Sequence, residues 1–346
     1  MLTVGLVSAF EYHLGLLMQQ IGLVRPEAIF DREKTLPVRD LLHASSIDDL
    51  KKAILASEVD SVLRSSFEDQ IEWIVKRTGT DKIQSNYKEW PLLIELLERR
   101  NLFAHTAGLI NSQYLSAAKK NSFPGYEKLK LETELHADYA YYRRAVNLIA
   151  DFGAKLIQVV WRKMLPTEVD KADRCVGDFG YELLLRGKYD LAVSILEFGA
   201  TLRNLSSDRT RRMMIVNLAN AHKLSGNTDK CEAVLIGEDW SSSSIEFRIC
   251  IAAIRNDVEQ TVALMNEFGR GKGIGLEGYQ EWPAFFHIRD NSQFKETVTE
   301  IFGVEFVPSA REKSSINQVI EMLRQKSGEP QKQISEVKPK EGQSVH

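Results

Sequence analysis

The sequence predicts an all-α protein in which an N-terminal helical bundle is followed by a stack of helix pairs. Apolar residues recur at intervals of three and four through most of the chain, as in helices that bury one side. Turn-forming residues divide these periodic segments, for example at Gly79, around Pro124 and at Pro166. In the second half, Gly187 and Gly226 each separate two periodic segments and lie 39 residues apart. That repetition predicts a helical repeat array.

Length and composition narrow the class of protein. A chain of 346 residues is long enough for two domains, and 43% hydrophobic with 27% charged residues is ordinary for a globular protein. The formal net charge of −3 excludes a strongly basic protein that binds nucleic acid regardless of sequence. This net charge is compatible with an RNA-processing enzyme that has one local basic site.

The sequence gives no sign of export or membrane insertion. No apolar run approaches the roughly 18 to 20 residues that a membrane-spanning helix needs, and Glu11 and His13 interrupt the apolar N-terminus. A signal peptide is therefore not expected. The three cysteines lack CxxC spacing, which favours reduced thiols, mostly buried, in a cytoplasmic protein (Cys175, Cys231 and Cys250).

Residues 1–165 are expected to form the bundle. The first helix is marked by an apolar periodicity at Phe10, Leu14, Leu17 and Ile21. A more irregular stretch follows over residues 25–44, and it contains Pro26 and Pro37. The next helix is expected to begin in the run of residues 45–49 (SSIDD), because serine caps a helix N-terminus and aspartate is favourable in the first turn.

Three further helical segments complete the expected bundle. One apolar face runs over residues 59–75 and ends at Gly79. Trp90 and Pro91 open the next helix, whose apolar stripe is expected to continue as far as Tyr114. A turn over residues 121–125 precedes a long periodic segment from Leu131 to Val160, which Pro166 ends.

Residues 166–303 are expected to form the repeat stack. Gly180 and Ala219 occupy equivalent positions before the two turns, and a weaker third copy places Asn256 where the other two have glycine. The pattern resembles degenerate tetratricopeptide-type repeats; the alternative is an ordinary helical domain. Residues 282–302 are aromatic-rich and are expected to cap the stack. For residues 304–346 we expect a C-terminal helix and a disordered tail, polar from Lys326 onward.

Residues 95–105 (ELLERRNLFAH) are the one place where the local pattern breaks. Arg100 lies in phase with the apolar stripe, although a guanidinium is costly to bury unless it is paired. Asn101 and His105 are four residues apart and therefore adjacent on one helix face. Histidine can move a proton near neutral pH, and arginine can stabilise charge on a phosphate oxygen, so this group suits phosphodiester chemistry. The alternative is that Arg100 pairs structurally with Glu95, Glu98 or a neighbouring helix, and that His105 is a partly buried polar residue.

The wider run ERRNLFAHTAGLINSQYL (residues 98–115) resembles the HEPN superfamily of helical nucleotide-binding domains. The family's mark is an arginine, usually followed by a polar residue, with a histidine four to six residues further on; here these are Arg100, Asn101 and His105. The resemblance covers roughly residues 1–160. It implies metal-independent ribonuclease chemistry at a two-fold interface, often in phage defence or stress responses. It also implies catalytic roles for Arg100, Asn101 and His105.

This sequence departs from the family pattern in two respects. Ala107 stands where one branch of the family has a tyrosine that is regulated by modification. No fused nucleotide-sensing domain is recognisable, because the repeats take its place. Family members exist that have lost activity, but the intact Arg100, Asn101 and His105 argue against that outcome for this chain.

Other candidate sites in the sequence are weaker. The glycine-rich residues 269–275 (GRGKGIG) lack the order of a phosphate-binding loop and follow a helical segment rather than a strand, so a loop between repeat and cap is the better interpretation. Arg209, Arg211 and Arg212 could touch RNA, but a solvated surface between repeats is the simpler interpretation. The remaining histidines are scattered, so no metal site and no cofactor are expected.

Two hypotheses about function follow from these observations. The first is an RNA endonuclease that acts as a homodimer through its N-terminal bundle, with the repeats recognising a trigger or a protein or peptide partner. The second is a dimeric adaptor without catalysis, whose repeats bind peptides. Only Arg100 and His105 separate the two, because an adaptor does not need an arginine in an apolar stripe.

Overall fold

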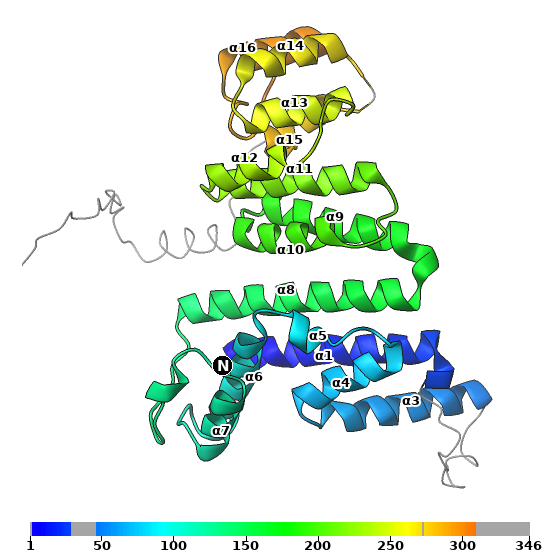
Figure 1. Cartoon of the computed structure of the whole chain (residues 1–346), viewed down its shortest axis with the longest axis vertical. Helices are drawn as coiled ribbons and strands as arrows, with labels where there is room; N and C mark the ends of the chain where they lie inside the picture. The colour runs from blue at the N-terminus through cyan, green and yellow to red at the C-terminus, as the bar shows by residue number, and fades with distance from the viewer. Residues whose placement is uncertain (1, 29–45, 272, 309–346) are drawn as a thin grey trace, which may run out of the picture.

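The computed structural model describes residues 2–28, 46–271 and 273–308, and it confirms the all-α fold. Within these residues, the sole β-type pairing is an isolated bridge between Leu109 and Glu134. Figure 1 shows the helices arranged as a tall column, with the N-terminal helices at one end and the C-terminal helices at the other. The long helix α8 crosses the column between these two groups.

The N-terminal part of the column is a bundle. Its helices are α1 (Leu2–Val24), η1 (Pro26–Ala28), α3 (Ile47–Leu63), α4 (Phe67–Thr78), α5 (Ile83–Asn86), α6 (Trp90–His105), α7 (Ser112–Lys120), η2 (Tyr126–Lys128) and α8 (Tyr139–Met164). Its main core lies between α1, α3, α4 and α8, and the largest buried side chains there include Met18, Ile21, Ile71, Ile74 and Phe152. Burial of these apolar surfaces supplies most of the driving force for folding the bundle.

Capping residues explain where the early helices begin and end. Ser46 caps α3 by accepting a hydrogen bond from the backbone N–H of Asp49, as the sequence predicted. The apolar run over residues 59–75 is divided between two helices, because Ser66 caps a new helix, α4. Gly79 ends α4 in the left-handed conformation, with φ of 68°. Of the irregular stretch expected over residues 25–44, residues 29–44 lie outside the described part.

Two further helix boundaries differ from the sequence-based expectation. The helix that begins at Trp90 ends at His105 and does not continue to Tyr114, because Ala107 and Gly108 both have positive φ. The long helix α8 begins at Tyr139 rather than near Leu131, because Asp138 caps its first turn through the backbone N–H of Tyr141. Leu131 and Leu135 instead lie in the segment that pairs with the loop after α6.

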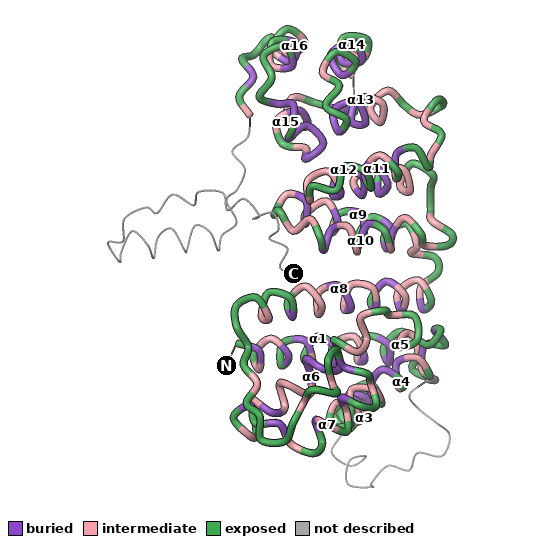
Figure 2. Tube along the Cα trace, turned by 60° about the vertical axis from the view of Figure 1, so that its left-hand side comes forward, coloured by how far each residue is buried: buried purple, intermediate pink, exposed green. Residues whose placement is uncertain are grey.

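The C-terminal part of the column contains three successive helix pairs and a terminal group. Its helices are η3 (Pro166–Glu168), α9 (Val169–Leu185), α10 (Tyr189–Thr201), α11 (Asp208–Leu224), α12 (Thr228–Ile236), α13 (Ile245–Ile254), α14 (Val258–Phe268), α15 (Leu276–Glu281), η4 (Pro283–Phe285) and α16 (Ser292–Phe302). Figure 2 shows buried residues on the sides of these helices that face their neighbours. Each pair therefore contributes to a core shared with the next one.

The turns inside the three pairs have the same backbone geometry. Gly187, Gly226 and Asn256 each adopt a left-handed conformation, with φ of 66°, 85° and 61°. In each turn the next N–H reaches a carbonyl in the last turn of the preceding helix, at 2.8, 2.8 and 3.0 Å. This is the hydrogen bond of a Schellman cap, which favours glycine or asparagine at the left-handed position. The turns thus explain the equivalence of Gly187, Gly226 and Asn256 in the sequence.

The last pair shares one core with the terminal helices. The aromatic side chains in this core are Tyr279, Phe285, Phe294 and Phe306, with Trp282 and Phe302 packed against them. The ring of Tyr279 lies 5.0 Å from that of Phe285 and 6.1 Å from that of Phe294. Of the C-terminal helix and tail expected over residues 304–346, residues 309–346 lie outside the described part.

Helix α8 belongs to both parts of the column. It packs against α1, α4 and α6 on one side and against α9 and α10 on the other. Polar contacts join it to the repeats: the Gln158 amide donates to the carbonyl of Ala172 at 3.0 Å, and Lys155 donates to the hydroxyl of Ser194 at 2.7 Å. The division between a bundle and a repeat domain near residue 165 therefore stays a prediction.

None of the described helices combines the length and the apolar character that crossing a membrane would require. Among the cysteines, Cys175 is exposed, whereas Cys231 and Cys250 are buried, and all three are free thiols. Burial raises the pKa of the Cys250 thiol to about 12. The buried cysteines are therefore packing residues in the core of the C-terminal helices.

The junction between α8 and α9 provides a test of this packing. The carboxylate of Asp173 is fully buried, pairs with Arg162 of α8 and accepts the backbone N–H of Ser206 at 2.6 Å. Asp173→Ala leaves the guanidinium of Arg162 without its partner, so we expect the free energy of unfolding to fall by about 3 kcal/mol. Urea unfolding of the full chain measures this loss.

Asp170→Ala is the matched control for this experiment. Asp170 lies one turn earlier on α9 and pairs with Arg174 on the exposed surface. Its removal should lower the free energy of unfolding by less than about 1 kcal/mol. Equal losses in the two variants would contradict the role assigned to the buried pair.

Candidate functional site

The residues singled out by the sequence lie at the C-terminal end of α6. Pro91 occupies the first turn of this helix, where a missing N–H is tolerated, and Leu93, Leu96 and Leu97 bury its apolar side. Arg100 and Asn101 are half-buried, whereas His105, the last residue of the helix, is exposed. The helix therefore presents these side chains at the edge of the bundle core.

Arg100 forms a two-pronged ion pair with Glu11 of α1. Its two terminal nitrogens donate to the two carboxylate oxygens of Glu11 at 2.9 and 2.5 Å. The two side chains are only 18% and 31% exposed. A bidentate pair of this kind fixes the orientation of the guanidinium. Arg100 therefore has a structural partner on a neighbouring helix, which is the alternative that the sequence left open.

Asn101 and His105 lie on the same side of α6, one turn apart. Because Arg100 is about 140° around the helix axis from His105 and is held by Glu11, it is not drawn toward the imidazole. No hydrogen bond joins Arg100, Asn101 and His105 to one another in the described part of the chain. The structure thus places the three side chains on one helix end without assembling them into a contact.

Glu98 is a carboxylate that lies one turn before the motif. Burial raises the pKa of Glu98 above its usual value, and the negative charge of Glu68 adds to this effect. A hydrogen bond with Asn101 and the positive charge of Arg100 oppose it. Glu98 is therefore easier to protonate than an exposed glutamate.

The loop after His105 holds the end of α6 in place. Gly108 has φ of 90°, and a Cβ there would lie 2.8 Å from the carbonyl oxygen of Leu135, so no other residue fits without displacement. The N–H of Leu135 donates to the carbonyl of Gly108 at 2.9 Å, and Ile110 exchanges backbone bonds with residues 132–133. Asn111 then caps α7. The Gly and Asn of the sequence context thus have structural roles.

Glu95 connects three helices from a buried position on α6. Its carboxylate accepts hydrogen bonds from Arg99 at 2.6 Å, from the hydroxyl of Tyr114 on α7 at 2.8 Å and from the hydroxyl of Tyr141 on α8 at 2.9 Å. Arg99 also lies over the ring of Tyr141, 4.3 Å from its centre. Burial and the negative charge of Glu95 raise the pKa values of both tyrosines, which keeps the hydroxyls as donors.

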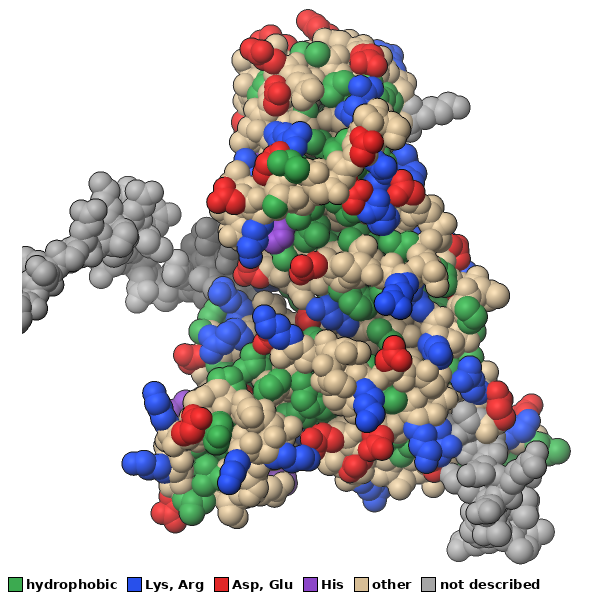
Figure 3. Space-filling model, viewed as in Figure 1, with side chains coloured by type: hydrophobic (Ala, Val, Ile, Leu, Met, Phe, Trp, Pro, Cys, Tyr) green, Lys and Arg blue, Asp and Glu red, His purple; other side chains and the backbone are tan. Residues whose placement is uncertain are grey.

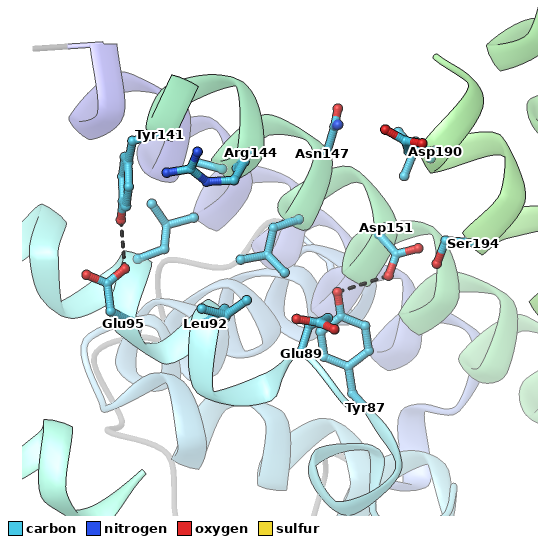
Figure 4. Close-up of a pocket in the computed structure, with 14 residues that line it drawn as sticks. Tyr87, Glu89, Leu92, Glu95, Tyr141, Arg144, Asn147, Asp151, Asp190 and Ser194 are labelled. Carbon is cyan, nitrogen blue, oxygen red and sulfur yellow. Dashed lines mark hydrogen bonds between the residues drawn. The ribbon is translucent and has the colours of Figure 1, made fainter. Parts of the chain in front are cut away.

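A second carboxylate, Asp151, connects α8 to its surroundings. It accepts a hydrogen bond from the hydroxyl of Tyr87 at 2.9 Å and pairs with Lys155, which in turn donates to Ser194 of α10. Between the Glu95 and Asp151 groups lies an open cleft of about 290 Å³. Figure 4 shows the cleft with α6 along one wall, α8 along another and α10 beside it.

The weaker candidates have structural roles where the structure describes them. Arg211 forms a two-pronged pair with Glu238 at 2.6 and 2.7 Å, and Arg212 pairs with Asp208. Arg209 lies over the ring of Phe247. In the glycine-rich loop, Arg270 donates to the carbonyl of Ile301. The contacts of Arg209, Arg211 and Arg270 join neighbouring segments, whereas the pair of Arg212 with Asp208 lies within α11.

Charged side chains of both signs are mixed over the visible surface, and potential metal ligands are dispersed in the described part of the chain. Figure 3 shows positive and negative side chains interspersed along the visible face, from the bundle to the cap. Across residues 2–28, 46–271 and 273–308, no group of three or more His, Cys, Asp or Glu side chains is placed to hold a metal ion.

Comparison with known proteins assigns the chain to no family. No family model, no curated protein and no solved structure matches the chain. The resemblance of residues 98–115 to HEPN domains and that of residues 166–303 to tetratricopeptide repeats therefore rest on the residues alone.

Glu11, the partner of Arg100, was not identified from the sequence, and Glu95, which the sequence offered as a possible partner of Arg100, pairs with Arg99 instead. Glu11 is the only Asp, Glu, Lys or Arg in residues 2–24, and Glu95 stands alone among the apolar residues 92–97. A single acid in an apolar helix needs a partner, because an unpaired buried charge is costly. That pattern indicates that Glu11 and Glu95 each need a partner. It does not indicate which cation each one contacts.

The raised pKa of Glu98 predicts a pH-dependent effect on stability. A carboxyl group whose pKa is raised in the folded state favours folding at low pH, and this contribution is lost as pH rises through the folded-state pKa. Glu98→Gln stays neutral and should therefore be more stable than the wild type at pH 8, with the smallest difference near pH 4. Thermal unfolding at the two pH values measures this difference.

Glu72→Gln serves as the control for Glu98→Gln, because Glu72 is exposed on α4. It removes one carboxylate from the same bundle without relieving a buried charge. A stability gain at pH 8 that is equal in both variants would mean that net charge, and not the burial of Glu98, causes the effect.

Proposed function

We propose that the chain is a metal-independent RNA endonuclease that acts as a homodimer. One observation carries the proposal: a guanidinium fixed by a carboxylate and an exposed imidazole occupy the same end of one helix. Such an arrangement supplies a positive charge of fixed position and a group that exchanges protons near neutral pH. The resemblance of residues 98–115 to HEPN domains supports the same reaction class.

The proposed reaction needs no group beyond these side chains and the RNA. The ribose 2′-oxygen bonds to the adjacent phosphorus, and the bond from phosphorus to the 5′-oxygen breaks. His105 of one copy accepts the proton of the 2′-hydroxyl, and the partner subunit's His105 donates a proton to the departing 5′-oxygen. The products are a 2′,3′-cyclic phosphate and a 5′-hydroxyl.

We assign Arg100 the role of stabilising the negative charge on the phosphate. A guanidinium has five N–H donors, and Glu11 accepts two of them. Donors therefore remain for a phosphate oxygen while Glu11 keeps the group in one orientation. Asn101 is assigned an orienting role, because an amide can donate a hydrogen bond but carries no charge.

The surface of α1 supports the proposed homodimer. The side of this helix that faces away from the bundle core carries exposed apolar residues, namely Leu2, Tyr12, Leu16 and Leu23. Tyr12 directly follows Glu11, the partner of Arg100. Exposed apolar residues along one side of a helix favour association, and a two-fold contact through this side would bring two copies of the site near each other.

We also assign the repeats a role in binding a protein or peptide partner, and we place the protein in phage defence or stress response. Both assignments rest on the resemblances. Stacked helix pairs offer extended surfaces for binding. Helix α8 packs both on these helix pairs and on the bundle.

The alternative function, a dimeric adaptor without catalysis, is favoured by the ion pair itself. Because Glu11 neutralises Arg100, the arginine in the apolar stripe is accounted for without a substrate. The absence of any contact between Arg100 and His105 is also compatible with this alternative. A measurement of activity separates the two functions.

The central prediction is that the protein cleaves RNA in the presence of EDTA. His105→Ala removes the group that transfers protons and should lower the rate by about 10²- to 10⁴-fold. Arg100→Ala should cost a comparable factor because it leaves the phosphate charge unmatched, whereas Asn101→Ala should have a milder effect. Product end groups should be a cyclic phosphate and a 5′-hydroxyl.

His136→Ala is the control for His105→Ala, because His136 is exposed in the same part of the chain and lies outside the motif. It should leave the rate unchanged. Wild-type rates in the His105 or Arg100 variant would refute the site assignment. A dimeric wild type that cleaves no RNA would leave the adaptor as the better account.

A separate prediction concerns the dimer. Leu16→Glu places a charge in the exposed apolar surface of α1 and should convert the full chain from dimer to monomer at tens of micromolar. Ile236→Glu is the matched control, because Ile236 is exposed on α12, far along the chain from α1. Light scattering gives the mass of each variant; a wild type that is already monomeric would contradict the proposal.

A further inference from the structure

The cleft between α6, α8 and α10, called the junction cleft here, is an open space of about 290 Å³ with a largely apolar floor. Side chains from all three helices form this floor, namely Leu92, Leu96, Ala145, Leu148 and Leu191. A neighbouring hollow of about 420 Å³ shares four lining residues with it, which are Tyr87, Glu89, Asp151 and Ser194. Space of this extent takes a small ligand, and the floor favours a ligand with an apolar group.

One side of α8 places polar groups of the junction cleft in a row. Arg144, Asn147 and Asp151 follow one another at intervals of four residues or fewer, so their side chains leave the same side of the helix. The rise from Arg144 to Asp151 is roughly 10 Å along the helix axis. That length is the distance over which a ligand lying along α8 can make polar contacts.

The two ends of the junction cleft differ in the sign of their charge. Arg144 lies at the end near Tyr141 (Figure 4). Glu89 and Asp190 lie at the other end, near Tyr87 (Figure 4). The junction cleft is therefore complementary in charge to a ligand with an anionic group at one end and a cationic group at the other.

The charges at both ends are available to a ligand. Arg144, Glu89 and Asp190 use their side chains in no ion pair or hydrogen bond within the described part of the chain. Glu89 directly precedes α6, and its carboxylate does not cap that helix. By contrast, Asp151 pairs with Lys155 at 2.8 Å, so these two groups neutralise each other. The unpaired groups come from both the bundle and the first helix pair.

Asn147 lies between Arg144 and Asp151 along α8 and also lines the junction cleft. Among the described residues, its side-chain amide has no hydrogen-bond partner. An amide offers both a donor and an acceptor, and the backbone of a peptide presents the complementary N–H and C=O groups. Asn147 is thus suited to hold the main chain of a peptide beside the apolar floor.

The distance between the charged ends selects the length of such a peptide. An extended chain spans at most roughly 3.3 to 3.6 Å per residue, so about three residues cover roughly 10 Å. A peptide of this length with free termini carries an ammonium at one end and a carboxylate at the other. It therefore supplies both charges that the junction cleft lacks, without needing charged side chains.

We propose that the junction cleft binds a short peptide with free termini, about three residues long and apolar at its centre. The carboxylate of the peptide pairs with Arg144, its ammonium pairs with Glu89 and Asp190, and its central side chain packs on the apolar floor. The bound peptide contacts α6, α8 and α10 together. Such binding rests on the peptide-partner role proposed above and requires no RNA cleavage, so binding and cleavage can fail separately.

Isothermal titration calorimetry of the full chain with the peptide Ala-Leu-Ala tests this binding. Acetylation of its N-terminus or amidation of its C-terminus removes one charge, and each change should weaken binding by about tenfold. The dipeptide Leu-Ala is too short to reach both ends and should lose a similar factor. Equally tight binding of the doubly capped peptide would overturn the proposal, because the ligand would then be an internal segment of a chain. Absence of binding at millimolar Ala-Leu-Ala would also overturn it.

Paired variants locate the peptide in the junction cleft. Arg144→Gln should weaken binding of free Ala-Leu-Ala by about tenfold and leave binding of the amidated peptide unchanged. Glu89→Gln combined with Asp190→Asn should weaken binding of the free peptide and not of the acetylated one. Arg143→Gln and Asp229→Asn are the matched controls, because Arg143 is exposed on α8 outside the cleft lining and Asp229 takes the position of Asp190 in the next helix pair. Losses of equal size in the controls would overturn the proposal.

Discussion

The fold depends on one constraint, which is that the single helix α8 must pack well on both of its sides. Its 26 residues bury Phe152, Leu156 and Val160 in the core of the bundle. The same helix uses Gln158 and Arg162 to meet α9 of the repeats. A change in the tilt of α8 would disturb both cores at once, because interiors are close-packed. The bundle and the C-terminal helix pairs are consequently coupled through one helix.

Partly or fully buried charged residues connect the helices of this arrangement. Glu11 meets Arg100, Glu95 meets Arg99 and two tyrosines, and Asp173 meets Arg162. Each pair is partly or fully withdrawn from water, so removing either member leaves a charge with no compensation. These pairs contribute to selecting one packing arrangement among the many that a purely apolar surface would allow. The motif at the end of α6 is held in place by the same pairs.

Helix α6 carries the proposed catalytic residues and also forms one wall of the cleft between α6, α8 and α10. Arg99, which directly precedes Arg100, is bound by Glu95 on the wall of the cleft and stacks on Tyr141 of α8. A ligand in the cleft would therefore contact the residues that position the motif helix. This arrangement gives a physical route by which the repeats could influence the bundle, since the coupling passes through a continuous set of packed groups.

The sequence alone determined the local features of this protein. Periodicity and capping residues such as Ser46, Gly79 and Gly187 predicted the all-α fold and several helix ends, because these depend on a few neighbouring residues. The sequence also identified Arg100 as a charge that required a partner. It did not show the break at Ser66, and it placed the end of α6 and the start of α8 wrongly. The end of α6 at His105 is accompanied by backbone pairing with residues 132–135, which are distant in sequence.

Only the tertiary structure decided which groups meet across helices. Glu11 and Arg100 are separated by 89 residues, and Arg144, Glu89 and Asp190 come from three elements that meet at the cleft. Local sequence rules describe which side of a helix is apolar but not which neighbour covers it. The partner of each buried charge is set by which helices pack side by side, and that depends on packing over the whole chain.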